Sequence, residues 1–284
     1  MTTTLLDFSQ RPELSLHARV VADVEAAAAP MGIVTLIAGA FARDLHLLYR
    51  HGIDVQRQTE DIDLAFALSD WAAFEALTQR LTASGAFRSS TNAAHRMRHR
   101  NGLPVDLVPF GTLETRQRTI AWPPRGEVVM DVFGFREALI AAHEIQLPGN
   151  VRTKLVSLPA LALLKIICWQ DRHYATPRKD AQDLYLIMRN YLHAGNEPRL
   201  WDEFRHWTDD DAFEYEPAGA RILGLDVGAL LDESGIERVA GVLSEQVDEA
   251  NPGPLSGEMS AHEPERARAM LAAMLDGLKE NRRK

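Results

Sequence analysis

The segment 59–66, Thr-Glu-Asp-Ile-Asp-Leu-Ala-Phe, alternates acids with apolar residues and then becomes apolar. Successive side chains of a strand point to opposite faces, so Asp61 and Asp63 share one face while Ile62 and Leu64 share the other. Two neighbouring carboxylates repel each other unless a positive group lies between them. The segment therefore predicts a half-buried strand that carries two acids toward a cation, although a lone Asp-x-Asp is also typical of a strand that ends in solvent.

A divalent metal ion suits this pair of acids. Mg²⁺ binds carboxylate oxygens and keeps coordination positions open for substrate phosphates. Phosphoryl or nucleotidyl transfer is therefore the first chemistry that the motif indicates.

Composition limits the other classes to which the chain could belong. With 284 residues, of which 46% are hydrophobic, it can build one large domain or two smaller ones. Its single cysteine, Cys168, excludes an internal disulfide. We expect a cytoplasmic protein, because the sequence shows no leader segment and no uncharged apolar run that would span a membrane. The net charge of −9 argues against a broad nucleic-acid-binding surface, so any such contact should be local.

The first half of the chain alternates between helical and strand patterns. Asp70 is placed to cap a helix, and Asn101-Gly102 is a strong signal for a tight turn between antiparallel strands. Besides the strand of Asp61, the patterns predict helices over 15–29, 41–49 and 70–85, and strands over 33–38, 86–91, 94–100 and 104–110.

From Leu158 onward the pattern becomes helical. The spacing of apolar residues predicts helices over 158–172, 177–193, 197–206, 219–248 in pieces, and 262–281. We therefore expect an α/β (α+β) fold. A mixed sheet flanked by helices would occupy a catalytic domain of residues 1–150, and a helical domain of residues 151–284 would follow.

A third carboxylate lies in the predicted strand over 104–110. There Asp106 interrupts an otherwise apolar sequence, and an unpaired buried acid would be costly. Facing the same way as Asp61 and Asp63 from a neighbouring strand, it would complete a three-carboxylate metal site. The alternative is a strand-end acid satisfied by backbone amides.

Gly39 and Ala40 lie where a predicted strand turns into a helix. The free backbone N–H groups and the helix dipole at such a turn favour an anionic phosphate, and glycine lets the phosphate approach closely. The alternative is an ordinary strand-to-helix turn.

Three motifs resemble the nucleotidyltransferase superfamily, whose pattern is a Gly-Ser or Gly-Gly turn, an Asp-x-Asp motif and a third acid. They are Gly39-Ala40-Phe41-Ala42-Arg43-Asp44, Arg57-Gln58-Thr59-Glu60-Asp61-Ile62-Asp63-Leu64, and Val105-Asp106-Leu107. The closest resemblance is to the AbiEii/AbiGii toxin-type nucleotidyltransferases, which add a lysine and an acid motif in their helical half. Lys165, Arg172 and the segment Arg178-Lys179-Asp180-Ala181-Gln182-Asp183-Leu184 resemble that addition. Ala40 departs from the Gly-Ser pattern and leaves only backbone amides at that position.

The resemblance implies a nucleotidyltransferase fold, a nucleoside triphosphate such as ATP as donor, and Mg²⁺ or Mn²⁺ as cofactor. It implies that Asp61, Asp63 and Asp106 hold the metal. It assigns catalysis to these three acids together with Lys165 and Asp183. It assigns nucleotide binding to Gly39, Ala40, Arg43, Arg57, Thr59, Lys165, Arg172 and Asp180.

Lys165 also has an argument of its own. Residues 161–169 are apolar nearly all round and must form a buried helix, so a lysine among them needs a polar destination. Lys165 and Arg172 fall on one stripe, from which both could bind triphosphate oxygens. The alternative is a lysine whose amine reaches solvent.

The next helix begins at Thr176-Pro177 and carries Asp180 and Asp183. Asp180 at a helix start also has a simple explanation in the helix dipole. The resemblance implies that an acid here contacts the nucleotide or helps to remove the acceptor's proton, and we favour Asp183 for this role.

The segment 95–100 is a basic strand in which Arg96, Arg98 and Arg100 share one face. Such a face could hold an RNA backbone or phosphates. We favour a solvated strand face, because arginine commonly protects exposed sheet surfaces.

We expect a metal-dependent enzyme that moves a nucleotide from a triphosphate to an acceptor hydroxyl, with its site in the cleft between the two domains. The resemblance implies tRNA or a protein as the acceptor, and a toxin restrained by a partner antitoxin. Two rivals stay open. One is a small-molecule nucleotidyltransferase of the aminoglycoside type, and the other is a catalytically silent module that binds nucleotide or protein.

Overall fold

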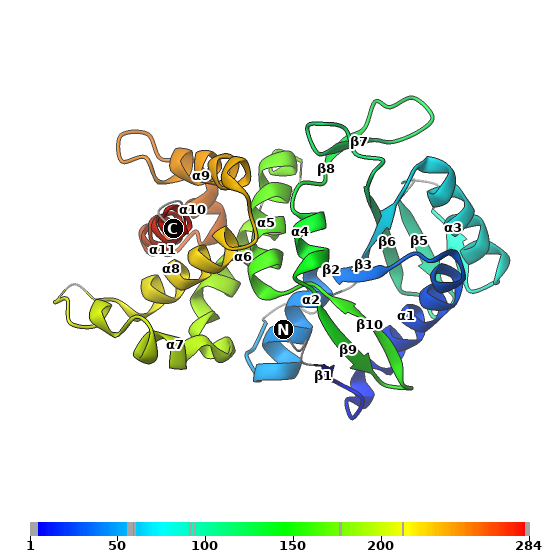
Figure 1. Ribbon diagram of the computed structural model, residues 1–284, viewed down its shortest axis with the longest axis horizontal. Coiled ribbons are helices and arrows are strands. Elements are labelled where there is room, and N and C mark those ends of the chain that lie inside the picture. Colours follow the sequence, from blue (N-terminus) through cyan, green and yellow to red (C-terminus); the bar gives the residue numbers. More distant parts are fainter. Residues whose placement is uncertain are drawn as a thin grey trace. The chain divides into compact units, whose positions relative to one another are not determined.

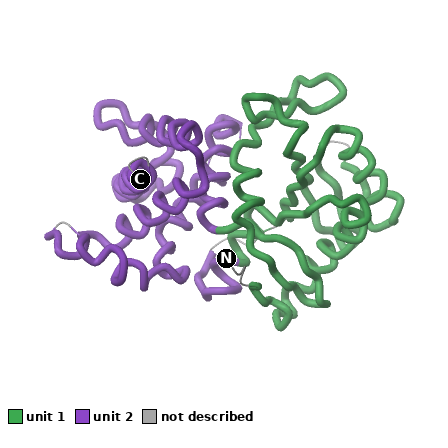
Figure 2. The backbone as a smooth tube through the Cα atoms, in the orientation of Figure 1, with its two compact units in different colours: residues 1–45, 56–157 green, residues 46–55, 158–284 purple. Residues whose placement is uncertain are grey.

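The computed structural model describes residues 5–55, 59, 61–90, 93, 95–175, 178–211 and 213–281. The chain forms two compact units, shown in Figure 2. Unit 1 comprises Met1–Leu45 and Gln56–Ser157, and unit 2 comprises His46–Val55 and Leu158–Lys284. The change to a helical pattern at Leu158 is thus the point at which the chain passes into unit 2 for the second time.

Unit 1 is built on a mixed sheet, which confirms the predicted fold class (Figure 1). Within the described residues its eight strands have the order β1-β9-β10-β2-β3-β6-β5-β4. The strands of this sheet are β1 (Leu6–Asp7), β2 (Thr35–Ala38), β3 (Ile62–Leu68), β4 (Phe87–Ser89), β5 (Arg96–His99), β6 (Pro104–Gly111), β9 (His143–Leu147) and β10 (Val151–Leu155). A separate hairpin pairs β7 (Thr119–Ala121) with β8 (Val129–Asp131).

The centre of the sheet combines parallel and antiparallel neighbours. β3 runs antiparallel to β2 and parallel to β6, and β5 runs antiparallel to β6. The apolar face of β3 is completely buried at Ile62, Leu64 and Phe66, as the alternation in the sequence predicts. Asp63 on the opposite face is only partly buried, so the charged side chain avoids the core.

Helices cover the sheet of unit 1. α1 packs against α3, β2 and β10, whereas α2 contacts β2 and β3. The predicted cap is confirmed, because the Asp70 carboxylate accepts a hydrogen bond of 2.8 Å from the Ala73 N–H at the start of α3. The helices of unit 1 are α1 (Ser15–Ala28), α2 (Gly39–Asp44), α3 (Trp71–Ala83) and α4 (Phe135–Ile140).

The regular secondary structure described in unit 2 is helical, with turns and loops between the helices. Its longest helix, α11, lies along α8, where Gly224 and Gly277 leave no room for a side chain between the two backbones. The α-helices of unit 2 are α5 (Leu158–Arg172), α6 (Lys179–Asn190), α7 (Glu197–Asp202), α8 (Tyr215–Gly228), α9 (Glu233–Val247), α10 (Leu255–Met259) and α11 (Pro264–Glu280). Shorter helical segments are the π-helical Leu45–Arg50, whose first residue belongs to unit 1, the π-helical Leu192–Asn196 and the 3-10 segment Arg205–Trp207. In the described parts of both units, no helix combines the length and the apolar character that crossing a bilayer requires.

Most predicted elements are confirmed, and the helix over 158–172 agrees at both ends. The helix predicted over 41–49 is divided between α2 and the π-helical segment Leu45–Arg50. The predicted start of the next helix at Thr176 and Pro177 lies outside the described residues. The strands β9 and β10 and the short helix α4 were not predicted.

Candidate functional site

The predicted acids of unit 1 lie on one face of the sheet at matched positions. Asp63 in β3 pairs in register with Asp106 in β6. Residues directly opposite each other on neighbouring strands project to the same face. Asp61 directly precedes β3 and lies near the same acids, because the guanidinium of Arg96 contacts both Asp61 and Asp106. We call Asp61, Asp63 and Asp106 the acidic row. The predicted convergence of these three residues on one side of the sheet agrees with the structure.

Gly39 lies against this row because β2 runs antiparallel to β3. The register pairs Ala38 with Asp63, so the first residue of α2 follows directly beside the Asp63 carboxylate. A Cβ atom at position 39 would lie 1.7 Å from Asp63 Oδ2. Gly39 also has a φ of 64°, in the left-handed region that favours glycine. Only glycine therefore allows the turn and the acid to lie this close together.

A guanidinium group bridges two members of the acidic row. Arg96 Nε donates to Asp106 Oδ1 at 2.6 Å, and its second nitrogen donates to Asp106 Oδ2 at 2.5 Å. The same nitrogen donates to Asp61 Oδ2 at 3.0 Å. These hydrogen bonds to Asp106, reinforced by the charges of all three acids, raise the pKa of Arg96. The prediction of a solvated arginine face is therefore wrong at Arg96, although its side chain is 41% exposed.

The donor chemistry of the row fits Mg²⁺ or Mn²⁺, because three carboxylates supply the oxygen ligands that these ions prefer. The Gly39 turn adds backbone N–H groups beside them. In the arrangement seen here, however, no three His, Cys, Asp or Glu side chains of the described residues are placed to hold one metal ion. Asp61 and Asp106 are spaced around the guanidinium of Arg96 instead.

Two residues predicted to bind nucleotide are engaged elsewhere. Arg43 is only 2% exposed, and its Nε donates to Asp44 Oδ1 at 2.9 Å. Thr59 donates to the other oxygen of Asp44 at 2.5 Å. Asp44 thus ties the end of α2 to the segment before β3. Arg57, the third basic candidate of this region, lies outside the described residues.

Unit 2 contains the second group of predicted residues, formed where α5 packs against α6. Lys165 Nζ lies 3.0 Å from Asp180 Oδ1 and 2.6 Å from Asp183 Oδ2. Arg172 Nε donates to Asp180 Oδ2 at 2.9 Å. The helical stripe predicted for Lys165 and Arg172 is therefore confirmed. The amine of Lys165 does not reach solvent, because the residue is only 7% exposed and both acids are 3% exposed.

The charges of this group hold one another ionised. Burial alone would lower the pKa of Lys165, but the charges of Asp183 and Asp180 outweigh it and raise that pKa. Burial likewise opposes ionisation of Asp180, yet Lys165 and Arg172 lower its pKa below the usual value. The group is thus a fully charged network in the helical unit.

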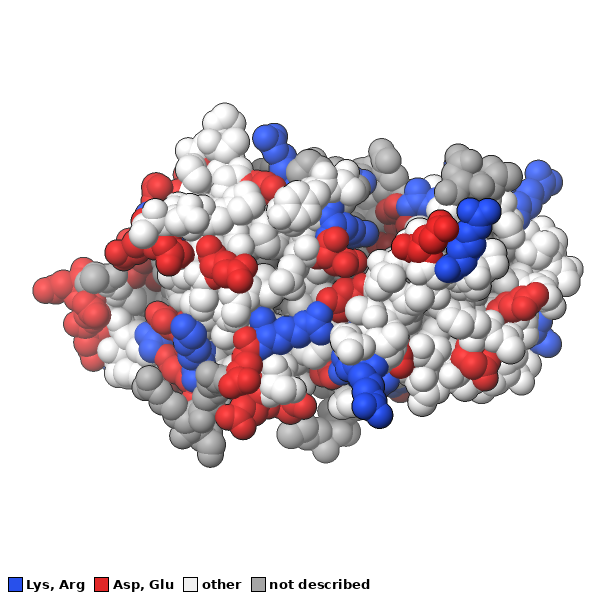
Figure 3. Space-filling view, turned by 90° about the horizontal axis from the view of Figure 1, so that it is seen from above, with Lys and Arg blue, Asp and Glu red and all other residues white. Residues whose placement is uncertain are grey.

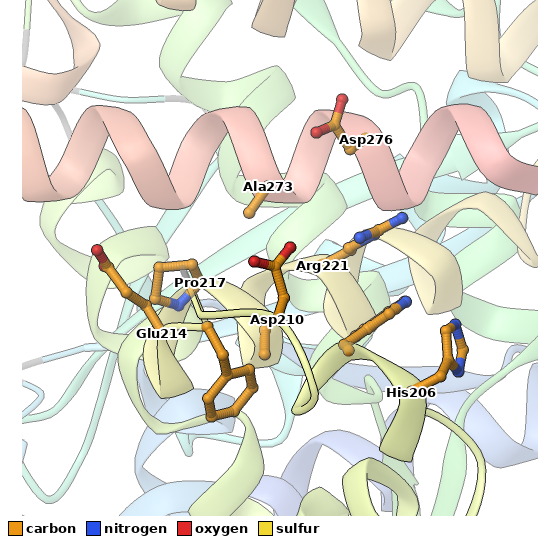
Figure 4. Close-up of a pocket in the computed structure, with 10 residues that line it drawn as sticks. His206, Asp210, Glu214, Pro217, Arg221, Ala273 and Asp276 are labelled. Carbon is orange, nitrogen blue, oxygen red and sulfur yellow. The ribbon is translucent and has the colours of Figure 1, made fainter.

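Pockets elsewhere in unit 2 are separate from these residues. The pocket in Figure 4 has a volume of about 260 Å³ and is lined by His206, Asp210, Arg221 and Asp276 among others, but by no predicted site residue. On the face shown in Figure 3, Lys and Arg side chains are scattered among Asp and Glu.

Sequence reasoning missed Arg96 and Asp44 as partners of the site. The tight-turn signal at Asn101-Gly102 is not enough to find Arg96, because a two-residue turn there would place Met97 opposite Asp106. The observed turn is one residue longer, and its register places Arg96 opposite Asp106. No signal marks Asp44, whose partner Thr59 lies in a different segment of the chain.

The mixed sheet, the acids on neighbouring strands and the glycine turn beside them are the layout of a nucleotidyltransferase. The sequence profile of the family described as "Nucleotidyl transferase AbiEii toxin, Type IV TA system" matches residues 27–283. The chain belongs to this family, which confirms the predicted resemblance and the enzyme class. A search of curated proteins gave no significant match.

Three solved structures are among those to which the chain is similar. ANT(2")-Ia in complex with adenylyl-2"-tobramycin is 15% identical, with 68% of this chain and 98% of that chain covered and a TM-score of 0.39. An antigenic nucleotidyltransferase-like protein from Paracoccidioides brasiliensis is 17% identical, with 71% and 93% covered and a TM-score of 0.39. The Thermotoga maritima CCA-adding enzyme complexed with tRNA is 14% identical, with 95% and 81% covered and a TM-score of 0.23.

Proposed function

We propose that the protein transfers a nucleotide from a nucleoside triphosphate to an acceptor hydroxyl in a reaction that depends on a divalent metal. The observation that carries this proposal is the acidic row with the Gly39 turn against it. Asp63 and Asp106 are direct neighbours in register, and Gly39 leaves no space for a side chain beside Asp63. Carboxylates next to backbone N–H groups suit a triphosphate carried by a metal ion.

The acidic row would hold the metal in this reaction. When bound there, Mg²⁺ or Mn²⁺ supplies charge to the triphosphate oxygens and makes the acceptor hydroxyl easier to deprotonate. The acceptor oxygen then bonds to the α-phosphorus while the bond from that phosphorus to the bridging oxygen breaks. Pyrophosphate leaves, and the hydroxyl proton passes to a carboxylate, a role that we assign to Asp106. The N–H groups of Gly39 and Ala40 orient the phosphates.

The residues around Asp44 have a positioning role in this proposal. Arg43 is buried on Asp44, and Thr59 donates to the same carboxylate. We assign them to holding the Gly39 turn and the strand of Asp63 in place, in preference to direct contact with nucleotide.

The charged network of unit 2 would help to bind the nucleotide. Arg172 is exposed enough to contact a phosphate, because half of its side chain is accessible to solvent. Lys165 is buried between Asp180 and Asp183 and contacts both, so we assign it to holding these acids in place, and through Asp180 also Arg172, in preference to direct contact with a triphosphate. Asp183 would orient the nucleotide or the acceptor.

The family description names a toxin of a Type IV toxin–antitoxin system. We therefore propose a hydroxyl of tRNA or of a protein as the acceptor, and a cognate antitoxin that restrains the activity. The acidic net charge of −9 favours an acceptor bound through a few local contacts.

The test is transfer of label from each of the four triphosphates, labelled at the α-phosphate, to total tRNA or to proteins of a cell lysate, with Mg²⁺ present. We expect labelled macromolecule with the wild-type protein and a loss of at least about 100-fold in Asp63→Asn and Asp106→Asn, because the metal and the phosphates lose their ligands. The matched control is Glu75→Gln, which changes an exposed acid on α3 of the same unit.

Two outcomes would contradict parts of the proposal. Labelling that survives in Asp63→Asn and Asp106→Asn would remove the acidic row from the reaction. Label found only in a small molecule would overturn the macromolecular acceptor and leave nucleotidyl transfer in place.

A further inference from the structure

Arg96 is the positive group that the acids of the row contact in this structure. Its guanidinium makes two hydrogen bonds to Asp106 and one to Asp61, all between 2.5 and 3.0 Å. A planar guanidinium that meets a carboxylate through two parallel N–H groups forms one of the stronger ion pairs in proteins. The negative charge of the row is therefore partly neutralised from within the chain.

The fold fixes this arrangement through strand register. β5 and β6 form a hairpin, and their antiparallel pairing places Arg96 directly opposite Asp106. The next strand, β3, places Asp63 opposite Asp106 on the other side. Arg96, Asp106 and Asp63 thus occupy one line across three neighbouring strands, and their side chains project to the same face.

A metal ion bound to the same carboxylate oxygens would lie close to the guanidinium of Arg96, so the two cations compete for these oxygens. Asp106 uses both of its oxygens on the guanidinium, and Asp61 uses one. Arginine keeps its charge at any ordinary pH, so it cannot release the carboxylates by losing a proton. The side chain can instead rotate away from the carboxylates, because 41% of it is already exposed to solvent.

We propose that Arg96 is a resident counter-cation of the acidic row that a divalent metal must displace, so that metal binding in the absence of nucleotide is weakened by this residue. The inference rests on the proposed function, because it takes the row to be the metal site. Once displaced, the guanidinium remains on β5 at the edge of the row. The triphosphate offers it a new anionic partner there, so nucleotide and metal bind more favourably together than separately.

The test is direct titration of Mn²⁺ followed by electron paramagnetic resonance of the free ion, with wild type, Arg96→Gln and Arg96→Lys in the absence of nucleotide. We expect Arg96→Gln to bind Mn²⁺ about tenfold more tightly than wild type, equivalent to about 1.4 kcal/mol. Arg96→Lys should also bind more tightly than wild type, because an ammonium cannot reproduce the paired hydrogen bonds to Asp106.

Arg98→Gln is the matched control. Arg98 lies on the same strand and the same face but donates to the backbone oxygen of Gly102. Its removal changes the charge of the face by the same amount without freeing an acid of the row. We expect its Mn²⁺ affinity to equal that of wild type. Circular dichroism and thermal unfolding confirm that each variant is folded, and Arg96→Lys carries the test if Arg96→Gln is not.

The outcomes separate this inference from the proposed function. The displacement of Arg96 would be contradicted if Arg96→Gln and Arg96→Lys bound Mn²⁺ as tightly as wild type, or more weakly. That result would leave a metal site on the row. Equal tightening in Arg98→Gln would overturn the displacement too, since a general charge effect would then suffice. If neither wild type nor any variant bound Mn²⁺, with or without a triphosphate, both the metal site and the displacement of Arg96 by a metal would be contradicted.

Discussion

At the scale of single residues, the candidate site depends on how closely Gly39 approaches Asp63. The structure combines two independent demands on position 39, a left-handed backbone and the absence of a Cβ atom. Gly32 provides a natural comparison, because its φ is 68° and a Cβ there would meet nothing within 4 Å. The difference between the two positions is therefore the contact with the acid.

We expect Gly39→Ala to destabilise the protein by about 2 to 4 kcal/mol, whereas Gly32→Ala should cost about 1 kcal/mol. Both variants place an alanine in a left-handed backbone conformation, which is unfavourable. Only Gly39→Ala also forces the Asp63 side chain to move. Urea unfolding measures the difference. Equal losses in the two variants would show that the Asp63 carboxylate can move away from the turn at no cost.

Sequence patterns predicted most of this residue-scale arrangement. Alternation along the strand placed Asp61 and Asp63 on one face, and the apolar context of Asp106 marked it as exceptional. The engagement of Arg96 was missed, because it depends on which residues of a hairpin face each other rather than on composition. The burial of Arg43 on Asp44 was missed because a tertiary contact decides where a flexible side chain goes.

At the scale of elements, the pairing of α5 with α6 depends on a buried lysine between two acids. Removal of one partner from a buried ion pair leaves an uncompensated charge in the interior, which costs far more than the net value of the pair. Arg172 contacts the same Asp180 but is half exposed, so water can replace much of what it provides.

We expect Lys165→Met to lower the free energy of unfolding by about 3 to 5 kcal/mol, because Asp180 and Asp183 would remain buried with one cation fewer. Arg172→Met should cost less than about 1 kcal/mol. Chemical denaturation compares the two. Adding Asp183→Asn to Lys165→Met should recover part of the loss, and a double variant no more stable than Lys165→Met would contradict the charge explanation.

The same network predicts how the stability of the folded protein changes at acidic pH. The pKa of Asp180 is lowered from its ordinary value of 3.8, so the unfolded chain binds its proton at a pH where the folded protein does not. The stability due to this acid is therefore complete above pH 3.8 and is lost as the pH falls below it. We expect the free energy of unfolding to fall less steeply below that pH in Asp180→Asn than in wild type.

The exposed Asp202 at the end of α7 is the control for this experiment. Asp202→Asn should keep the wild-type slope when unfolding is followed in urea at several acidic pH values. A wild-type slope in Asp180→Asn as well would mean that the α5–α6 pairing does not hold this acid ionised.

Elements with long periodic patterns were predicted well, and short ones were not. The helix over 158–172 has an apolar periodicity across four turns, so its ends could be placed. The strands β9 and β10 have five residues each and carry charged side chains at their exposed positions, which leaves too short a pattern to recognise. The pairing of β9 with β1 and of β10 with β2 joins residues far apart in the sequence, so no local pattern predicts it.

At the scale of the whole molecule, the sequence divides into a sheet unit that carries the acidic row and a helical unit that carries the Lys165 network. Family membership extends over both units, since the match covers residues 27–283. The matched region therefore contains both the acidic row and the Lys165 network. Each unit nevertheless supplies its own well-defined group of charged residues, which can be tested separately.

The central claim is that the acidic row binds a triphosphate through a divalent metal. It is tested most directly by isothermal titration calorimetry with a triphosphate analogue that resists cleavage at the α-phosphorus, with and without Mg²⁺. We expect wild type to bind the analogue only with Mg²⁺, and Asp63→Asn to bind it at least about tenfold more weakly, with Glu75→Gln unchanged. Wild-type affinity in Asp63→Asn, or equal binding by wild type with and without Mg²⁺, would contradict the claim.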